Sequence, residues 1–317
     1  RAGVSWVRNP SRFLYAQKYG GSGNGFWNAG SPVVIFDGSA LQFGYFPTFV
    51  ATGDGGAAFA WYETGGTRNV YTQRLGNGGM ELHPHNGVPV SLNIAGRIRL
   101  NPSLVRDTNT QETYVFWVEA TNPENMWGVY GQRIINNGDR MWTNNGKEIV
   151  PLSGLQTSNV KCILNGTGAG ATVFWSDQPG AAATLKGARL DLNSNFVWSG
   201  PAIITPCSTA STKSRLDVAR SACGEALLAW TDSRPHAADI YAQNAPATGK
   251  FGTRRNGDWN EDGTVNILDL LGVVAGWGPC FNSPCASDLS PEPTPTSCGG
   301  DGQTNILDLL TVVANWG

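Results

Sequence analysis

A tryptophan returns five times through residues 1–252, and its spacing constrains the fold more than any other feature of the chain. Neighbouring copies stand 55, 56, 58 and 55 residues apart, and each ends a short apolar run. The five copies are Trp6, Trp61, Trp117, Trp175 and Trp230. A feature that recurs this regularly requires a fold made of five similar units in succession.

Each unit has the sequence pattern of about four short strands. An apolar strand such as 102–106 precedes most of the tryptophans, and a run such as 70–75 follows. A third element, such as 85–92, comes next in the first four units. Turns rich in Gly, Asn and Asp separate these runs, and no long helical pattern interrupts them. Four-stranded repeats are typical of β-propeller blades. We therefore predict an all-β repeat domain over residues 1–252, a β-propeller with about five blade-like units. An open array of β-sandwiches is the alternative.

The side chains that recur are predicted to be structural. The tryptophans and the tyrosine of the YxQ run would fill the wedge between neighbouring blades, because large aromatic rings suit such spaces. An acid stands two residues after four of the tryptophans, at Glu63, Glu119, Asp177 and Asp232. A catalytic residue is needed once, so this equivalence favours a structural turn position.

The two outer units are shorter than the others. The first begins at its tryptophan strand, and the fifth ends after the strand-like run that follows its tryptophan. Because the chain also begins with Arg1, we expect it to be an N-terminally truncated piece of a longer protein. The fifth unit carries the pattern W-x-D-x-R…DIYAQ as Trp230, Asp232, Arg234 and residues 239–243. In this it resembles a family of repeats in secreted bacterial propeller proteins.

The C-terminal segment is a second, different duplication. Residues 266–278 read NILDLLGVVAGWG, and residues 305–317 read NILDLLTVVANWG. Oxygen-bearing side chains precede the first copy at the spacing of an EF-hand-like calcium loop over 258–269, with Gly263 at the sharp turn. Its predicted ligands are Asp258, Asn260, Asp262, the carbonyl of Thr264, Asn266 and Asp269. A polar turn that caps a helix is the alternative.

The second copy of the loop is degenerate. Counted over 297–308, it starts at Ser297 and has Gly299 at the third position, which lacks a side-chain oxygen. The remaining candidate ligands are Asp301, Gln303, Asn305 and Asp308. We therefore predict one Ca²⁺ site in the first loop, and weaker binding or none in the second.

Each loop leads into a short amphipathic helix. One apolar stripe consists of Ile267, Leu270, Leu271 and Val274, and the second consists of Ile306, Leu309, Leu310 and Val313. Neither helix can bury its stripe alone, so the two are predicted to pack on each other. About 60 residues make a marginal core, and a bound metal is a usual supplement at that size.

Tandem loop–helix units of this kind resemble a type I dockerin, over residues 257–317. The paired LLxVVAxWG endings are similar to tails of secreted bacterial proteins, planctomycete ones in particular. The resemblance implies a calcium-binding module at 253–317 that docks on a cohesin-like domain or another cell-surface anchor. It also implies partner-binding residues at Ile267, Leu268, Ile306 and Leu307, for which a plain core role is the alternative. The cysteine- and proline-rich segment 279–298 departs from the family, as does the absence of Lys and Arg from residue 256 onward.

The charge distribution and the cysteines limit the compartment and the partners that suit this chain. The formal net charge of −2 combines eight acids and no bases in residues 256–317 with 22 bases and 16 acids before them. No basic run suggests a nucleic-acid partner, and no apolar run is long enough to span a membrane. Cysteines without a zinc spacing favour disulfides and a secreted or cell-surface protein. The expected pairs are Cys280 with Cys285 or Cys298, and Cys207 with Cys223; Cys162 is predicted to be a buried free thiol.

The sequence contains little that indicates catalysis. His83 and His85 could form a metal pair, but a solvated loop is favoured for them, as it is for His236. No nucleophile elbow, HExxH helix or phosphate loop appears. We therefore predict no catalytic residue and a binding or scaffold protein rather than an enzyme. Its propeller would bind a protein or a glycan, and its calcium-loaded tail would anchor it. The alternative is an extracellular carbohydrate-active enzyme that carries a dockerin.

Overall fold

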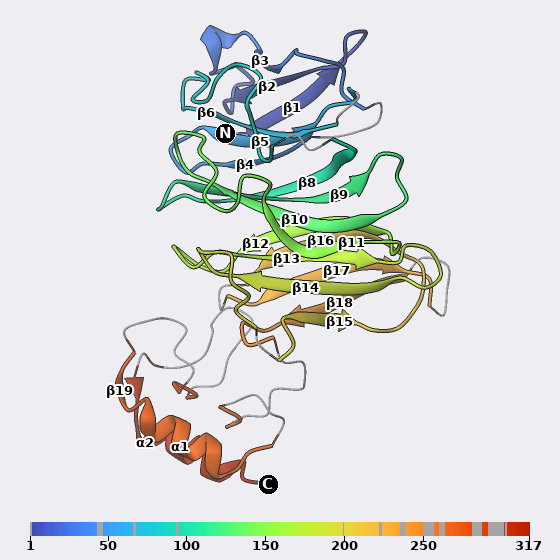
Figure 1. The fold of residues 1–317 in the computed structure, drawn as a ribbon. Coiled ribbons are helices and arrows are strands. Elements are labelled where there is room, and N and C mark those ends of the chain that lie inside the picture. The colour runs from blue at the N-terminus through green and yellow to red at the C-terminus, as the bar shows by residue number, and fades with distance from the viewer. Residues whose placement is uncertain are drawn as a thin grey trace. The chain divides into compact units, whose positions relative to one another are not determined.

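The protein is seen here as a computed structural model (Figure 1). It describes residues 2–42, 47–65, 68–92, 95–198, 200–221, 224–234, 239–249, 257–259, 264–280, 287–290, 301 and 303–317. The chain forms two compact units, Arg1–Val218 with Ala229–Tyr241, and Ala219–Leu228 with Ala242–Gly317.

Five successive antiparallel sheets contain the strands β1 to β18, and in each sheet the strands follow one another in chain order. The first sheet consists of β1 (Ala2–Arg8), β2 (Phe13–Tyr19) and β3 (Val33–Phe36), with the short helix η1 (Asn28–Gly30) before β3, and the second consists of β4 (Thr48–Ala51), β5 (Ala57–Tyr62), β6 (Val70–Leu75) and β7 (Val88–Pro89). The third sheet consists of β8 (Arg97–Asp107), β9 (Glu112–Thr121), β10 (Trp127–Ile134) and β11 (Lys147–Ser153), and the fourth consists of β12 (Thr157–Leu164), β13 (Ala171–Asp177), β14 (Thr184–Leu190) and β15 (Ile203–Cys207). The fifth sheet consists of β16 (Lys213–Arg220), β17 (Ala226–Asp232) and β18 (Asp239–Ala245).

This arrangement confirms the predicted repeat of antiparallel β units. The three central sheets have four strands each, and the described strands of the first and fifth sheets number three. The closure of the sheets into a propeller ring stays a prediction.

Neighbouring sheets pack face to face through apolar clusters. One cluster joins Leu14 and Ile35 of the first sheet to Phe59 of the second. A further cluster joins Ala58 of β5 to Leu104 of β8, and the third and fourth sheets share another. The strand that carries the tryptophan is therefore covered on both faces in the second sheet, and every residue of β5 is buried.

The repeat tryptophans stack on tyrosines inside their own sheets. Trp61 lies directly opposite Tyr71 in the β5–β6 ladder, with ring centroids 6.1 Å apart. The same cross-strand stack occurs in the first, third and fifth sheets. The prediction that these pairs fill the space between blades was therefore incomplete. Trp61 does reach across to Phe36 of the first sheet, at 5.4 Å, but its tyrosine partner belongs to the same sheet.

The glutamine of the YxQ run has a role that sequence reasoning missed. Gln17, Gln73 and Gln132 are buried. The side-chain oxygen of each accepts the backbone N–H of the next residue and that of the residue ten positions further on, at 2.8 to 3.1 Å. The side-chain nitrogen donates to carbonyls of the returning loop. We call this arrangement the glutamine clamp, because it holds the loop against the strand.

The C-terminal segment contains two matching helices, α1 (Ile267–Ala275) and α2 (Ile306–Ala314), and the short strands β19 (Gly278–Pro279) and β20 (Gln303–Thr304). Each helix starts at an asparagine N-cap, Asn266 or Asn305. Asp269 and Asp308 complete the two capping boxes, in which a side chain at each end satisfies a backbone N–H at the other.

The predicted inner stripes of these helices are confirmed at Leu270 and Leu309 and are wrong at their other positions. The core consists of Val265, Val273, Leu289 and Val312, with Trp259, Leu270 and Leu309 packed against it. Ile267, Leu271 and Val274 of α1 are exposed. These helices are apolar on most sides, so periodicity alone does not select the face. The inner face is the one that carries the buried aspartates of the two capping boxes and the buried Val273 and Val312.

The cysteines were predicted in part. Cys162 is a buried free thiol, as expected, and burial raises its pKa to about 12. Cys207 is also free, so the predicted Cys207–Cys223 disulfide is wrong. Cys280 is disulfide-bonded, while Cys285 and Cys298 lie outside the described residues.

The glutamine clamp predicts a specific loss of stability. Gln132→Ala should lower the free energy of unfolding by about 2 kcal/mol or more, because buried backbone N–H groups lose their acceptor. Gln243→Ala is the matched control. Gln243 occupies the same repeat position in the fifth sheet, but its side chain bonds only to Asn244 in the described part of the chain. Urea unfolding of both variants measures the difference, and equal losses would contradict the clamp.

Candidate functional site

Two of the acids that follow a tryptophan are part of buried ion pairs. Glu119 accepts the indole N–H of Trp117 at 2.8 Å and lies 3.3 Å from the guanidinium of Arg99, which is fully buried. Asp232 accepts the indole N–H of Trp230 at 3.0 Å and pairs with Lys213 at 3.2 Å. These contacts confirm the structural role that the repeat predicted.

The two acids respond differently to their surroundings. Burial raises the pKa of Glu119, against the opposing charge of Arg99. Burial would also raise the pKa of Asp232, but hydrogen bonds from Ser211, Trp230 and Lys213 together hold it below its ordinary value. Neither acid lies exposed to a substrate, because both side chains are buried.

His83 was expected in a solvated loop, but it is buried. It occupies the loop position of the glutamine clamp that Trp27 and Trp142 occupy in the first and third units. Burial lowers the pKa of His83 to about 4, helped by the charges of Arg74 and Arg106, so its ring is neutral near pH 7. The backbone N–H of His83 donates to the side-chain oxygen of Gln73, as the clamp requires. The imidazole ring therefore takes the place of a tryptophan and does not face solvent.

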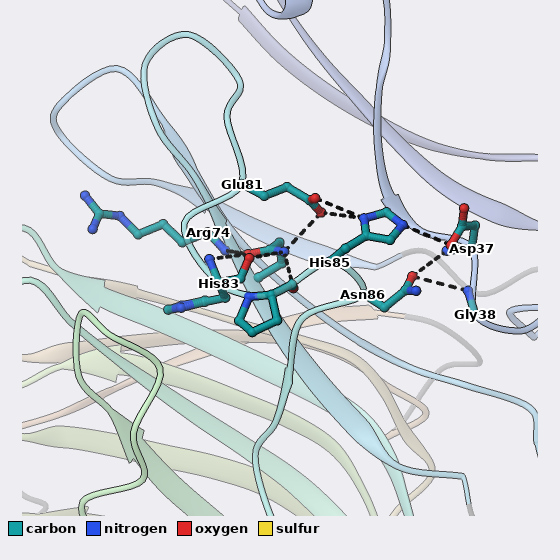
Figure 2. Close-up of polar contacts among 9 residues, drawn as sticks. Asp37, Gly38, Arg74, Glu81, His83, His85 and Asn86 are labelled. Atoms are coloured by element: carbon teal, nitrogen blue, oxygen red, sulfur yellow. Dashed lines mark hydrogen bonds and ion pairs between the residues drawn. The ribbon is translucent and has the colours of Figure 1, made fainter.

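His85 lies between two carboxylates (Figure 2). Its Nδ1 is 2.9 and 3.1 Å from the Glu81 oxygens, and its Nε2 is 3.0 Å from Asp37. Asn86 accepts the backbone N–H groups of Asp37 and Gly38. Since Asp37 follows β3 and His85 precedes β7, this cluster joins the first sheet to the second.

The two histidines do not form a metal pair. Both nitrogens of His85 face carboxylates, and His83 is held inside the clamp. Across the described ranges, no group of three or more His, Cys, Asp or Glu side chains could hold a metal ion. His236 lies outside those ranges.

The first strands of the third and fourth sheets share a β-bulge opposite the repeat tryptophan. The β8–β9 register shifts between Leu100 and Ser103, opposite Trp117, and the β12–β13 register shifts at the equivalent place. Three residues of these first strands have the left-handed backbone conformation, at φ 49, 52 and 53: Asn101 in β8, Asn159 in β12 and Arg215 in β16. Non-glycine residues adopt this conformation rarely, and bulges re-aim neighbouring side chains.

The bulged strands carry polar side chains that meet across sheets. Lys161 of β12 pairs with Asp217 of β16 at 3.4 Å, and the Asp217 side chain is 78% exposed. Ser103 of β8 lies 3.4 Å from the Cys162 sulfur in β12. Asn101 and Arg215 are exposed. We call Asn101, Asn159, Lys161, Arg215 and Asp217 the bulge face.

The predicted first calcium loop is described in part. Asp258 and Asp269 are buried, Asn266 is half-buried and Thr264 is exposed. Asn260, Asp262 and Gly263 lie outside the described residues. Asp269 accepts the backbone N–H of Asn266 at 2.8 Å through one oxygen.

The second loop contains an acid that sequence counting missed. Asp308 accepts the N–H groups of Leu289 and Ser290, and Asp288 accepts the N–H of Asp301 at 3.0 Å. Asp288 therefore stands where Asp258 stands in the first copy. The signal was present in the sequence, because Asp288-Leu-Ser290 parallels Asp258-Trp-Asn260, but a nine-residue insertion relative to the first copy separates it from Asp301. Gln303 is exposed and Asn305 is the half-buried N-cap, whereas Ser297 and Gly299 lie outside the described residues.

The four residues implied as partner-binding are at the surface. Ile267, Leu268, Ile306 and Leu307 are 50 to 54% exposed. The alternative of plain core residues is therefore wrong. Trp277 and Trp316 extend the two exposed apolar stripes at matching positions.

No family model matches the chain, and no curated protein matches it. Several solved structures are similar at low identity. An endo-arabinase from Bacteroides thetaiotaomicron shares 12% identity over 76% of this chain and 88% of its own, with a TM-score of 0.39. An exo-beta-1,3-galactanase from Phanerochaete chrysosporium shares 11% over 80% and 54%, with a TM-score of 0.37. The NanB sialidase of Streptococcus pneumoniae, as its K499G mutant, shares 12% over 73% and 35%, with a TM-score of 0.47.

These similarities correct one expectation. The sequence favoured a binding or scaffold protein that is not an enzyme, whereas the similar structures are an arabinase, a galactanase and a sialidase. The non-enzymatic interpretation is therefore withdrawn. At these identities and scores, the similarities assign neither a family nor a reaction. In the described residues, no helix is long and apolar enough to cross a membrane.

The His85 cluster predicts a pH-dependent contact between the first two sheets. The hydrogen bond that His85 donates to Glu81, together with the one to Asp37, raises the pKa of His85 above its ordinary 6.5. The stability that protonated His85 contributes to the fold is therefore fully present below the ordinary pKa of histidine. It is lost as the pH rises through the higher pKa that His85 has in the folded protein. His83 acts in the opposite direction, because its pKa is lowered.

The difference in melting temperature between the wild type and His85→Gln isolates His85, since His83 titrates in both. That difference should be positive near pH of about 5.5 and shrink towards pH of about 8.5. Asp37→Asn should lower the melting temperature relative to the wild type with the same pH dependence. A difference that does not change with pH would contradict the contact.

Proposed function

We propose that the chain is an extracellular carbohydrate-active protein whose stacked sheets form a β-propeller and present the bulge face to a glycan. The observation that supports this most is the left-handed backbone at Asn101, Asn159 and Arg215. Three equivalent first strands keep an unfavourable conformation, and such strain is concentrated at functional sites.

The chemistry of the bulge face suits a sugar. Sugar hydroxyls both donate and accept hydrogen bonds, and amide side chains such as Asn101 and Asn159 do the same. Arg215 adds donors, and the exposed Asp217 adds acceptors. Glycoside hydrolysis needs two carboxyl groups about 5–10 Å apart, and Asp217 is the carboxylate that the bulge face supplies. Hydrolysis is thus the reaction to test alongside binding.

Glycine substitutions test the bulge face without disturbing its backbone, because glycine adopts the left-handed conformation freely. The double variant Asn101→Gly, Asn159→Gly should bind polysaccharides, or release reducing ends from them, at least about tenfold less well than the wild type. Its melting temperature should be unchanged or higher. The readouts are a panel of neutral and acidic polysaccharides and a reducing-sugar assay. Gln178→Gly is the matched control, since Gln178 is also exposed and left-handed, at φ 53. Unchanged binding and hydrolysis in the double variant would exclude the bulge face.

We also propose that the C-terminal segment binds Ca²⁺. The carboxylates of Asp258 and Asp269 are buried, and carboxylate oxygens are ligands that Ca²⁺ prefers. Asp288, Asp301 and Asp308 would contribute to a second site across the insertion. When bound, Ca²⁺ would neutralise these acids and let each loop close on its helix, which couples binding to folding. Calcium loading would fix the two exposed apolar stripes side by side for docking on a cohesin-like partner or cell-surface anchor.

A charge-only change tests the calcium proposal. Asp269→Asn keeps an oxygen that can accept the capping hydrogen bond, but it removes a negative ligand. The variant should lose one bound Ca²⁺ in calorimetric titration of the full chain, and it should lose the calcium-dependent rise in melting temperature. Asp139→Asn, in an exposed turn between β10 and β11, is the control. Retention of full stoichiometry in Asp269→Asn would show that the ligand assignment is wrong.

A further inference from the structure

A pocket of about 280 Å³ lies between the first and second sheets. Its wall from the first sheet includes Gly3, Lys18 and Trp27, and its wall from the second includes Phe49 and Ala51. At the position of Gly3, the second sheet has Ala58 and the third has Tyr114.

The pocket exists because small residues stand where side chains of two sheets should meet. Gly3 of β1 lies directly opposite Lys18 of β2, so both occupy one face of the first sheet. Gly3 fills none of that space, and a Cβ built on it would meet Phe49 at 3.4 Å. Phe49 and Ala51 are two residues apart on β4 and therefore face the same side.

The ammonium group of Lys18 is buried beside this pocket without an acidic partner. Lys18 is 8% exposed. Its Nζ donates to the Gly55 carbonyl at 2.6 Å and to the Asn77 side-chain oxygen at 2.7 Å, and both acceptors are neutral. Among the ion pairs of the described residues, none includes Lys18. Two of its three N–H groups are thus used, and its charge is not balanced.

Comparison with the other repeats shows that a carboxylate is what this position lacks. The basic residue after the clamp glutamine is Lys18 in the first unit, Arg74 in the second and Arg133 in the third. Arg74 pairs with Asp54 at 2.7 Å, and Arg133 pairs with Glu112. A buried charge is costly unless it is paired, and the fold supplies the pair in two of these three units.

The indole of Trp27 is also unsatisfied within the described part of the chain, as is that of Trp61 in the second sheet. The Nε1 of Trp27 is buried and has no hydrogen-bond partner among the described residues. The equivalent indole of Trp142 donates to the Leu192 carbonyl at 3.0 Å. The pocket wall therefore combines the Lys18 ammonium with the apolar side chains of Trp27 and Phe49.

We propose that this pocket binds a carboxylate-bearing sugar, a hexuronate unit of an acidic glycan. The carboxylate pairs with Lys18, and the apolar face of the ring lies against Phe49 and Trp27. The volume is at the lower end of the range for ligand pockets, which fits one sugar ring rather than an oligosaccharide. The choice of a sugar over another small carboxylate rests on the proposed glycan function; the carboxylate follows from the repeat comparison alone.

Calorimetric titration of the full chain with free hexuronates tests the pocket. Glucuronate or galacturonate should bind at least about tenfold more tightly than glucose or galactose, which lack the carboxylate. Lys18→Met should abolish this preference. Gly3→Leu should abolish binding by filling the pocket while leaving Lys18 intact. Lys147→Met is the control, because Lys147 lies over the Phe196 ring, away from the pocket. Melting temperatures verify that each variant is folded, and Lys18→Gln replaces Lys18→Met if the latter is not.

The outcomes separate this proposal from the bulge face. Hexuronate binding that survives Lys18→Met and Gly3→Leu would overturn the pocket, whatever the polysaccharide assays show. If benzoate bound in the same calorimetric titration and neither hexuronate did, the assignment of the ligand as a sugar would be overturned. Hexuronate binding lost in both pocket variants but kept in the double variant of Asn101 and Asn159 would support the pocket even if the bulge face failed its own test.

Discussion

Face-to-face stacking is the constraint on which the β repeat depends. A strand covered by apolar neighbours on both faces, as β5 is, leaves no water for the polar groups beside it. Most such groups must therefore find a partner inside the repeat, and the indole N–H of Trp61 is an exception in the described residues. The glutamine clamp and the indole–acid pairs answer this requirement in more than one unit, and the buried Arg99–Glu119 pair answers it in the third.

The units differ mainly in how completely they meet it. In the second and third units, a carboxylate balances the basic residue that follows the clamp glutamine. In the first unit that balance is missing at Lys18, and an indole N–H nearby is unused. The departures from an otherwise consistent repeat thus mark where a ligand would complete the structure, just as the strained first strands mark where the repeat presents polar groups outward.

Much of the fold could be predicted from the sequence, because local patterns specify it. The tryptophan spacing and the alternation of short strands were enough to predict the number of units and the succession of short strands in each. The role of Gln73 could not be read in the same way, since its partner His83 is ten residues away and backbone groups leave no trace in the sequence. For the same reason, His83 was placed in solvent although it fills a tryptophan position.

The C-terminal segment shows a second limit of sequence reasoning. Ile267 and Val273 are both apolar residues of one helix, and only the packed structure tells that the second is the inner one. Asp288 was missed because an insertion hides its equivalence to Asp258. Candidate site residues that only tertiary contacts bring together could not be predicted from spacing: Lys18 with Trp27, and Lys161 with Asp217.

The burial of Cys162 has a consequence for how the chain matures. The thiolate is the reactive form of cysteine, and a thiol with a pKa near 12 is almost wholly protonated under physiological conditions. Once β12 lies against β8, with Ser103 beside the sulfur, this thiol is chemically silent. Before that contact forms, it can compete for the partners of Cys280. Burial of Cys162 in the central sheets therefore keeps its thiol away from the disulfide chemistry of the C-terminal segment.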